Sequence, residues 1–260
     1  MSEAVAAGID VGSHNATAVL LGPSGVLGHA ILASAEEGER AARRSLEEAC
    51  ARAGGIPAPQ NVVATGCGRS QVSFAARRSS EVLCQARGTH HLFPQARTVL
   101  NLGAESNRAV RISPDGRATA FATNDKCAAG SGRFLELMAR VLEVPLEEMG
   151  ELALSADSRA EVSSRCAVFA ESEVISHIHR GVPRAEILAG IHAAVVDRIV
   201  ELAGRIEVEP EVAVTGGLAL NRALLAELES RLGLPLLVPP EPRLVGALGA
   251  ALASAASPRE

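Results

Sequence analysis

The chain has 260 residues, 47% of them apolar, and a formal net charge of −5, which allows one large or two small domains with packed cores. The acidic balance and the absence of Trp and Tyr leave little for phosphate contacts or base stacking, so we expect no nucleic-acid partner. No apolar run approaches the roughly 18–20 residues that span a bilayer, and the first residues do not look like a secretory signal. We therefore expect a cytoplasmic protein without a membrane partner.

The first segment predicts two strands joined by a turn over residues 4–21, followed by a third strand over 26–32. Asp10 ends the first strand, and Gly12, Ser13 and His14 form the turn. The backbone amides of such a turn can bind a phosphate, and the carboxylate can hold Mg²⁺ through water. The same residue types also suit an ordinary hairpin turn, so the pattern leaves both interpretations open.

The order of elements then begins again. After a helix, a buried strand and a second helix, three further strands are expected around a second glycine-bearing turn, which contains Asn101 and Gly103. The ranges are 36–53, 62–66 and 80–92 for the first group and 98–103, 108–112 and 118–122 for the three strands. Two halves with the same order of elements indicate an internally duplicated α/β architecture.

Five cysteines are scattered along the chain, an odd number that favours a reducing compartment over a disulfide framework. They are Cys50, Cys67, Cys84, Cys127 and Cys166. In such a compartment a cysteine is a small apolar filler, a reactive thiol or a metal ligand, and filler is the most common of the three. For Cys50, Cys67 and Cys84 we expect a structural role.

Cys127 and Cys166 are placed alike, each just ahead of a predicted amphipathic helix. The unpaired N–H groups and the dipole at a helix start favour negative charge, so a thiolate, a phosphate or an anionic metal cluster would suit either position. The matching placement makes a shared role more plausible than it would be for one cysteine. Two adjacent histidines at 90 and 91, and two more at 177 and 179, are expected near helix ends.

The remaining elements predict a long helix, a strand, a paired-glycine turn at Gly216-Gly217, a helix, a short strand and a final helix rich in Gly and Ala. Their ranges are 184–206, 211–214, 222–232, 236–238 and 246–252. A paired glycine between a strand and a helix allows the backbone to approach an adenosine or a phosphate closely. The small residues of the last helix suit close packing against a sheet or another helix.

Taken together, the chain resembles the BadF/BadG/BcrA/BcrD ATPase family of the actin, sugar kinase and Hsp70 superfamily. The matching stretches are Gly8-Ile9-Asp10-Val11-Gly12-Ser13, Asn124-Asp125-Lys126-Cys127-Ala128-Ala129-Gly130, Cys166-Ala167-Val168-Phe169-Ala170-Glu171-Ser172-Glu173-Val174-Ile175, Gly190-Ile191-His192, Thr215-Gly216-Gly217 and Val245-Gly246-Ala247-Leu248-Gly249-Ala250-Ala251. The resemblance implies a duplicated ribonuclease H-like α/β fold with a nucleotide cleft between two subdomains. Subdomain I would comprise 1–95 plus 241–260, and subdomain II would comprise 96–240.

The resemblance also implies the site. Asp10 and Glu105 would take part in ATP hydrolysis with Mg²⁺. ATP or ADP would be bound by Gly12, Ser13, His14, Asn101, Gly103, Ala104, Gly216, Gly217 and Asn221. Cys127 and Cys166 match the two cysteines that hold a 4Fe–4S cluster in the family. Since such a cluster usually takes four thiolates, two chains would share one cluster on a two-fold axis.

The implied activity is ATP-driven electron transfer by an oxygen-sensitive dimer. Ferredoxin or flavodoxin would donate the electron, and a 2-hydroxyacyl-CoA dehydratase or a related acyl-CoA reductase such as benzoyl-CoA reductase would receive it. The dimer could be a homodimer or a heterodimer of paralogous chains.

The sequence departs from the family at the phosphate end. Thr17 stands where relatives usually carry Lys, and Asn101 and Ser106 replace two acidic residues of the pattern Asp-x-Gly-Gly-Gln-Asp. These changes weaken a role in binding magnesium or positioning water. One alternative is therefore a nucleotide-binding paralogous subunit of a benzoyl-CoA reductase-type complex that hydrolyses ATP weakly. Another is a small-molecule kinase of the same superfamily, against which Cys127 and Cys166 argue because phosphoryl transfer does not need them.

Overall fold

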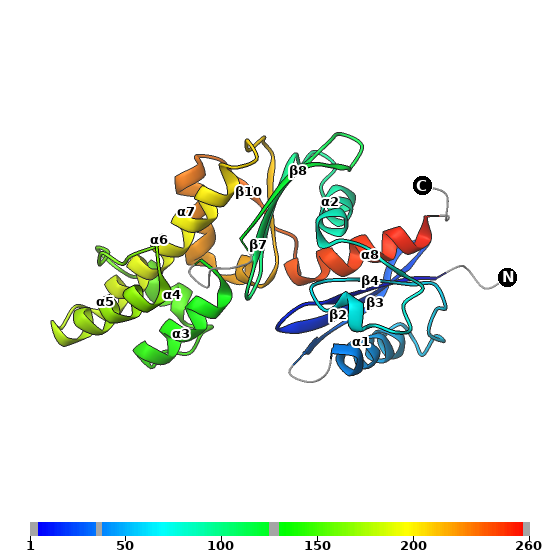
Figure 1. Cartoon of the computed structure of the whole chain (residues 1–260), viewed down its shortest axis with the longest axis horizontal. Coiled ribbons are helices and arrows are strands. Elements are labelled where there is room, and N and C mark those ends of the chain that lie inside the picture. Colours follow the sequence, from blue (N-terminus) through cyan, green and yellow to red (C-terminus); the bar gives the residue numbers. More distant parts are fainter. Residues whose placement is uncertain (1–4, 35–37, 125–129, 257–260) are drawn as a thin grey trace. The chain divides into compact units, whose positions relative to one another are not determined.

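The computed structural model describes residues 5–34, 38–124 and 130–256 (Figure 1). Cys127 therefore lies outside the described residues. The chain forms two compact units. Unit 1 comprises Met1–Ala96, Ile112–Thr119 and Pro239–Glu260, and unit 2 comprises Arg97–Arg111 and Ala120–Val238.

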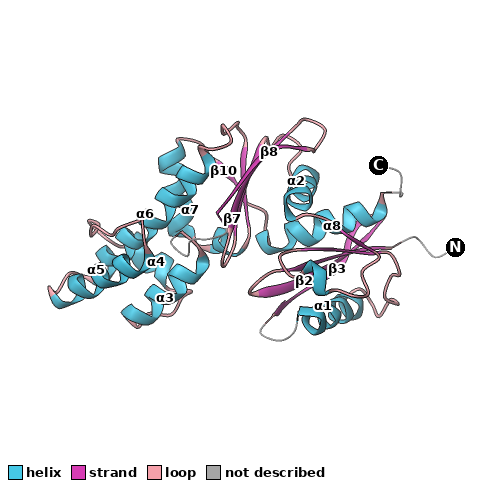
Figure 2. Ribbon diagram, viewed as in Figure 1, coloured by secondary structure: helices cyan, strands magenta, loops and turns pink. Residues whose placement is uncertain are grey.

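Each unit is built on a five-stranded sheet (Figure 2). The sheet of unit 1 has the order β3-β2-β1-β4-β5, and the sheet of unit 2 has the order β10-β9-β6-β7-β8. In unit 1 the strands are β1 (Ala6–Val11), β2 (Asn15–Gly22), β3 (Gly25–Ala33), β4 (Val62–Thr65) and β5 (Arg77–Arg78). In the second sheet they are β6 (Thr98–Leu102), β7 (Asn107–Ile112), β8 (Ala118–Asn124), β9 (Val212–Thr215) and β10 (Leu236–Leu237).

The two sheets have the same topology. In each, the first strand is central, pairs antiparallel with the second strand and parallel with the fourth. The third strand lies outside the second and the fifth outside the fourth, so that β6 to β10 repeat the arrangement of β1 to β5. This repetition confirms the duplicated ribonuclease H-like α/β fold that the sequence predicts.

Helices cover the sheets of both units. The helices are α1 (Gly38–Arg52), α2 (Glu81–Leu92), α3 (Gly132–Leu142), α4 (Met149–Leu154), α5 (Ala167–His179), α6 (Arg184–Ala203), α7 (Arg222–Leu232) and α8 (Val245–Ala255). Three short 3-10 helices complete the described structure: η1 (Arg69–Gln71), η2 (Gly217–Leu220) and η3 (Pro242–Leu244). No helix of the described residues is long and apolar enough to cross a membrane.

Close packing in unit 1 depends on glycine, as the composition of the last helix predicts. A Cβ added at Gly8 would lie 2.1 Å from the Ala247 carbonyl oxygen, so β1 and α8 touch backbone to backbone. At Gly249 it would lie 1.9 Å from the carbonyl oxygen of Cys84 on α2. Any larger side chain at these positions would separate the elements, because a packed interior cannot absorb the added volume.

Unit 2 is built around α6, and one apolar face of this helix is buried. Ile187, Ile191, Val195, Ile199 and Leu202 are all at most 2% exposed. The amphipathic helix predicted after Cys166 is α5. Of its apolar residues Val168, Phe169, Val174, Ile175 and Ile178, only Val174 is buried, while Val168 and Phe169 are each 68% exposed and Ile175 and Ile178 each 40%.

Candidate functional site

The phosphate-1 turn (residues 10–15) joins β1 to β2 in unit 1. The Gly12 N–H donates to the Asn15 carbonyl at 2.9 Å, which closes the turn. Ser34 supports it from the end of β3: its Oγ donates to the Gly12 carbonyl at 3.1 Å and its N–H to the His14 carbonyl at 2.9 Å. Since the Gly12 amide is engaged, the amides of Ser13 and His14 are the candidates to face a phosphate.

The Asp10 side chain is fitted between two glycines. A Cβ added at Gly246, on α8, would lie 2.1 Å from Asp10 Oδ2, and one added at Gly66 would lie 2.5 Å from Oδ1. The amide nitrogen of Gln85 would also lie close to the added Gly246 Cβ, at 3.1 Å. The absence of side chains at positions 66 and 246 is therefore what leaves room for the carboxylate at the end of β1.

Thr17 also belongs to this region. It lies directly opposite Asp10 in the β1–β2 ladder and is 3% exposed. Directly paired residues place their side chains on the same face of a sheet. The departure from lysine at this position thus falls next to Asp10, in a place where a long charged side chain would need room.

In unit 2 the equivalent strand end carries Asn101. Asn101 is 8% exposed, and its Nδ2 donates to Thr215 Oγ1 at 3.2 Å, which links β6 to β9. A carboxylate at this position could not donate that bond. The amide therefore has a structural partner of its own.

The phosphate-2 turn (residues 101–106) continues from β6. The Gly103 N–H is shared between the Ser106 carbonyl at 3.2 Å and Asn107 Oδ1 at 3.1 Å. As in the phosphate-1 turn, the following amides, those of Ala104 and Glu105, are the candidates to face a phosphate. The Ser106 hydroxyl accepts from Arg108 at 3.0 Å.

Glu105 lies on the outside of this turn and pairs with Arg133 on α3. The closest N–O distance is 3.3 Å, and the two side chains are 53% and 47% exposed. Arg133 contacts Glu136 as well, at 3.4 Å. The proposed catalytic carboxylate is therefore bound to a cation in this structure.

The adenosine turn (residues 215–221) follows β9. Gly216 has a φ of +87°, and a Cβ there would lie 2.3 Å from the Leu102 carbonyl oxygen, so this position requires glycine. Gly217 differs, because nothing lies within 4 Å of its added Cβ. Open space beside Gly217 is what close approach of a ligand would need.

Asn221 has two protein partners. Its Oδ1 accepts from the Leu224 N–H at 3.0 Å and caps α7, and its Nδ2 lies 3.0 Å from His192 Nε2. His192 Nδ1 lies 2.7 Å from the Leu188 carbonyl. Because a carbonyl only accepts, Nδ1 carries the proton and Nε2 accepts from Asn221.

His192 is a structural residue that the sequence does not identify as such, although it falls in one of the matching stretches. It is 2% exposed, and burial lowers the pKa of its imidazole. The neutral ring joins α6 to the start of α7, and so fixes the end of the adenosine turn.

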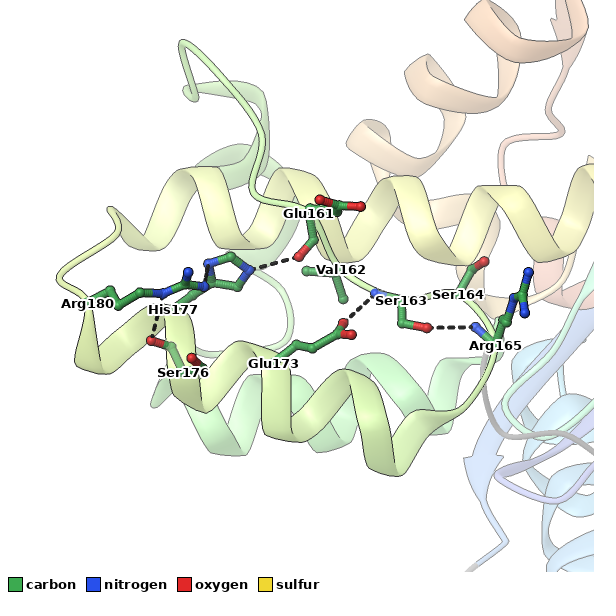
Figure 3. Close-up of a pocket in the computed structure, with 9 residues that line it drawn as sticks. All are labelled: Glu161, Val162, Ser163, Ser164, Arg165, Glu173, Ser176, His177 and Arg180. Atoms are coloured by element: carbon green, nitrogen blue, oxygen red, sulfur yellow. Dashed lines mark hydrogen bonds between the residues drawn. The ribbon is translucent and has the colours of Figure 1, made fainter.

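Cys166 occupies the N-cap position of α5, as predicted, and is half-buried. The segment before it is anchored to α5 along a pocket of about 630 Å³ (Figure 3). Glu173 accepts from the Ser163 N–H at 2.6 Å, and His177 Nε2 lies 2.8 Å from the Glu161 carbonyl. These bonds hold residues 161–165 along the helix and so position Cys166 at its start.

The ring of His177 has a defined tautomer in this network. Arg180 donates to Nδ1 at 2.9 Å, so Nε2 carries the proton that is given to the Glu161 carbonyl. As expected, His177 lies in the last turn of its helix, and His90 and His91 lie in the last turn of α2.

No other described cysteine shares this setting. Cys50 and Cys84 are buried, and burial raises the pKa of both thiols, as expected for apolar filler. Cys67 is exposed in unit 1. Among residues 5–34, 38–124 and 130–256, no three His, Cys, Asp or Glu side chains gather as a metal site.

The comparisons with known proteins match most of the chain. A model of the BadF/BadG/BcrA/BcrD ATPase family matches residues 7–254. The activator of lactoyl-CoA dehydratase from Anaerotignum propionicum is 42% identical over 246 residues, which cover 94% of this chain and 95% of that protein. A benzoyl-CoA reductase subunit from Thauera aromatica is 37% identical over 220 residues, covering 82% and 77%.

Solved structures agree with the fold. The activator of the 2-hydroxyisocaproyl-CoA dehydratase from Clostridium difficile with bound ADPNP has a TM-score of 0.90 at 36% identity, over 96% of this chain and 94% of that one. A ROK family glucokinase from Streptomyces griseus has a TM-score of 0.62 at 13% identity, over 96% and 98%, and shares the fold alone.

Proposed function

The chain belongs to the BadF/BadG/BcrA/BcrD ATPase family, and on that premise we propose that it is an ATP-dependent activator of a 2-hydroxyacyl-CoA dehydratase or a related acyl-CoA reductase. It would accept an electron from ferredoxin or flavodoxin and deliver it at low potential. The observation that carries the proposal is Cys166 held at the start of α5, in a chain that covers 95% of a named activator.

The nucleotide would be bound by the three glycine-bearing turns. Asp10 would act through Mg²⁺ on the phosphates, and the amides after Gly12 and Gly103 would donate to phosphate oxygens. Gly217, with open space beside it, would lie near the nucleoside, with Gly216 and Asn221 fixing the shape of that turn. Glu105 would position water for hydrolysis.

The chemistry of Cys166 supports a 4Fe–4S cluster as the cofactor. Such clusters take Cys thiolates, and Cys166 offers a half-buried sulfur at a helix start, where the dipole favours the negative charge of a thiolate and a cluster. Cys127, which lies outside the described residues, would be the second ligand. When bound, the cluster supplies a one-electron carrier.

A second chain would complete the site. Two thiolates of one chain are half of the usual set of four, which favours one cluster shared across a two-fold axis. The apolar residues that α5 leaves exposed, Val168 and Phe169 foremost, directly follow Cys166 in the chain. An exposed apolar surface beside a shared site is what a dimer interface would bury.

The weakly hydrolysing paralogue remains the alternative. It is favoured by Asn101, whose amide is engaged with Thr215 where the activator pattern has an acidic residue, and by the match to the benzoyl-CoA reductase component from Thauera aromatica. The rate of ATP hydrolysis by the purified protein separates the two, because only the activator is expected to hydrolyse ATP alone at a rate typical of the family.

Iron content tests the cluster. Protein purified without oxygen should be coloured and contain iron, and Cys166→Ser and Cys127→Ser should each remove it. Cys67→Ser is the matched control, because this exposed thiol has no proposed ligand role, and it should keep the iron. A colourless wild-type protein that takes up no iron on anaerobic reconstitution would overturn the proposal.

A further inference from the structure

We propose that Asn107 is a positioning residue that links the phosphate-2 turn to the start of α3. Through this link, the conformation at the start of α3 depends on which nucleotide is bound. The inference rests on the proposed function, since it takes a nucleotide to bind at the turn. Asn107 is 1% exposed. Its Oδ1 accepts from the Gly103 N–H at 3.1 Å, and its Nδ2 donates to the Gly130 carbonyl at 2.6 Å.

The turn and the helix are also joined through their backbones. The Gly132 N–H donates to the Gly103 carbonyl at 3.1 Å, and the Arg133 N–H donates to the Ala104 carbonyl at 2.8 Å. The first N–H groups of a helix have no partner within it and need one outside. At α3 the N-cap residue Ser131 makes no side-chain cap bond, and the phosphate-2 turn serves as the cap.

Two glycines make this contact close. A Cβ at Gly132 would lie 3.1 Å from the Ala104 Cα, and Gly130 has a φ of +91° with its added Cβ 2.6 Å from the Arg198 Cβ on α6. The start of α3 is therefore packed between the turn and α6. Because this contact is closely packed, a displacement of the turn also displaces the start of α3.

A phosphate-dependent change in the turn would thus reach α3 by three routes. Asn107 carries it through a buried side chain, and the two carbonyls of Gly103 and Ala104 carry it through the backbone. The Glu105–Arg133 pair is half exposed, and exposed ion pairs contribute little, so we expect it to be the weakest route. In the sequence, α3 begins at Gly132, five residues after the proposed cluster ligand Cys127.

Hydrogen exchange measures this link directly. The anaerobically purified protein is compared without nucleotide, with ADP and with a non-hydrolysable ATP analogue, while calorimetry on the same samples measures nucleotide binding. We expect exchange in residues 101–106 and in α3 to differ between the two nucleotides. Binding together with a response of the turn but none of α3 would refute the link and leave the proposed function standing. Absence of nucleotide binding would refute the proposed function instead.

The variant Asn107→Leu keeps the branched shape of the side chain and removes both bonds. We expect nucleotide binding to persist, while the difference in hydrogen exchange of α3 between ADP and the analogue falls by about fivefold or more. Fivefold is the lower end of the effects that coupling between two sites usually produces. Asn107→Ser, a polar side chain too short to bridge, is the second variant if the first does not fold. Asn61→Leu is the control, because it removes an asparagine side-chain bond in unit 1, from Asn61 Nδ2 to the Ser254 carbonyl at 2.7 Å, and it should leave the α3 response unchanged. A full α3 response in a folded Asn107 variant would contradict the assignment.

Discussion

The phosphate-1 and phosphate-2 turns occupy the same place in the duplicated topology, yet their surroundings differ. Each follows the first strand of its sheet and leads into the antiparallel second strand. The phosphate-1 turn is held by strand ends and by Ser34, with the Asp10 carboxylate fitted against Gly246 on α8. The phosphate-2 turn instead forms the N-terminal cap of α3.

The two turns therefore have different structural neighbours in the duplicated fold. In unit 1 a carboxylate is fitted between two glycines, and the short helix η1 begins at the turn, with the N–H of its N-cap residue Gly68 donating to the Val11 carbonyl at 2.9 Å. Unit 2 attaches to its turn the helix that begins after the proposed cluster cysteine.

The largest effect, on the rate of ATP hydrolysis, is expected from Gly246→Ala, which disturbs the position of the Asp10 carboxylate in unit 1. The new Cβ would take the space of Asp10 Oδ2, 2.1 Å away, and displace the carboxylate. A misplacement of about 1 Å can cost about 100-fold in rate, so we expect kcat/KM for ATP hydrolysis to fall by about that factor. Gly204→Ala, at the end of α6, is the matched control, since its added Cβ would meet nothing closer than 3.5 Å and Gly204 has no proposed role in the site. Hydrolysis at the wild-type rate by a folded Gly246→Ala protein would show that Asp10 does not need this position.

An intermediate effect is expected from acidification, through His192 in unit 2. Burial lowers the pKa of the folded imidazole below the ordinary 6.5, and the unfolded chain takes up a proton near that ordinary value. Below about pH 6.5 the unfolded state therefore binds more protons, and the free energy of unfolding falls as the pH drops towards the folded pKa. Above that pH the stabilisation is fully present.

Urea unfolding followed by far-UV circular dichroism, carried out above and below about pH 6.5, measures this dependence of the free energy of unfolding on pH. His192→Gln should reduce the dependence of stability on pH, while His91→Gln, at an exposed position in α2, should not. Equal losses of stability on acidification in wild type and His192→Gln would place the dependence elsewhere.

The smallest effect, on the free energy of unfolding, is expected from Arg133→Gln. This variant removes the ion pair between the phosphate-2 turn and α3 in unit 2. Both partners of the Glu105–Arg133 pair are about half exposed, so the loss of stability should stay below about 1 kcal/mol and shrink with added salt. Arg43→Gln is a matched control, because it removes a similarly exposed pair with Glu39 in unit 1. In thermal unfolding the two variants should behave alike, and only Arg133→Gln should lower the nucleotide response of α3. A loss of several kcal/mol in the free energy of unfolding would contradict this and show that the pair contributes strongly to stability.

The sequence predicts the fold well because the repeated order of strand, glycine turn and strand is a local pattern that occurs twice. It does not predict β5, since Arg77 and Arg78 offer neither an apolar run nor an alternation. For α5 the apolar spacing predicts a helix, but spacing alone cannot tell whether the apolar residues meet the same chain or a partner. Their exposure is a property of the tertiary structure.

The same distinction between local pattern and tertiary contact applies to the candidate site. Cys166 at a helix start and the glycine turns are visible in the sequence, because their positions depend on neighbouring residues. Asn107 looks like any polar residue at the start of a strand, and its two bonds join Gly103 to Gly130, which only the folded chain brings together. His192 likewise gains its role from Asn221 at the start of another helix.

The central claim is that two chains share one cluster, and native mass spectrometry of the anaerobically purified protein tests it most directly. The account predicts a dimer whose mass exceeds that of two chains by one 4Fe–4S cluster, with the added mass lost in Cys166→Ser and kept in Cys67→Ser. A cluster-free dimer or monomer, or a monomer that carries a whole cluster alone, would contradict it.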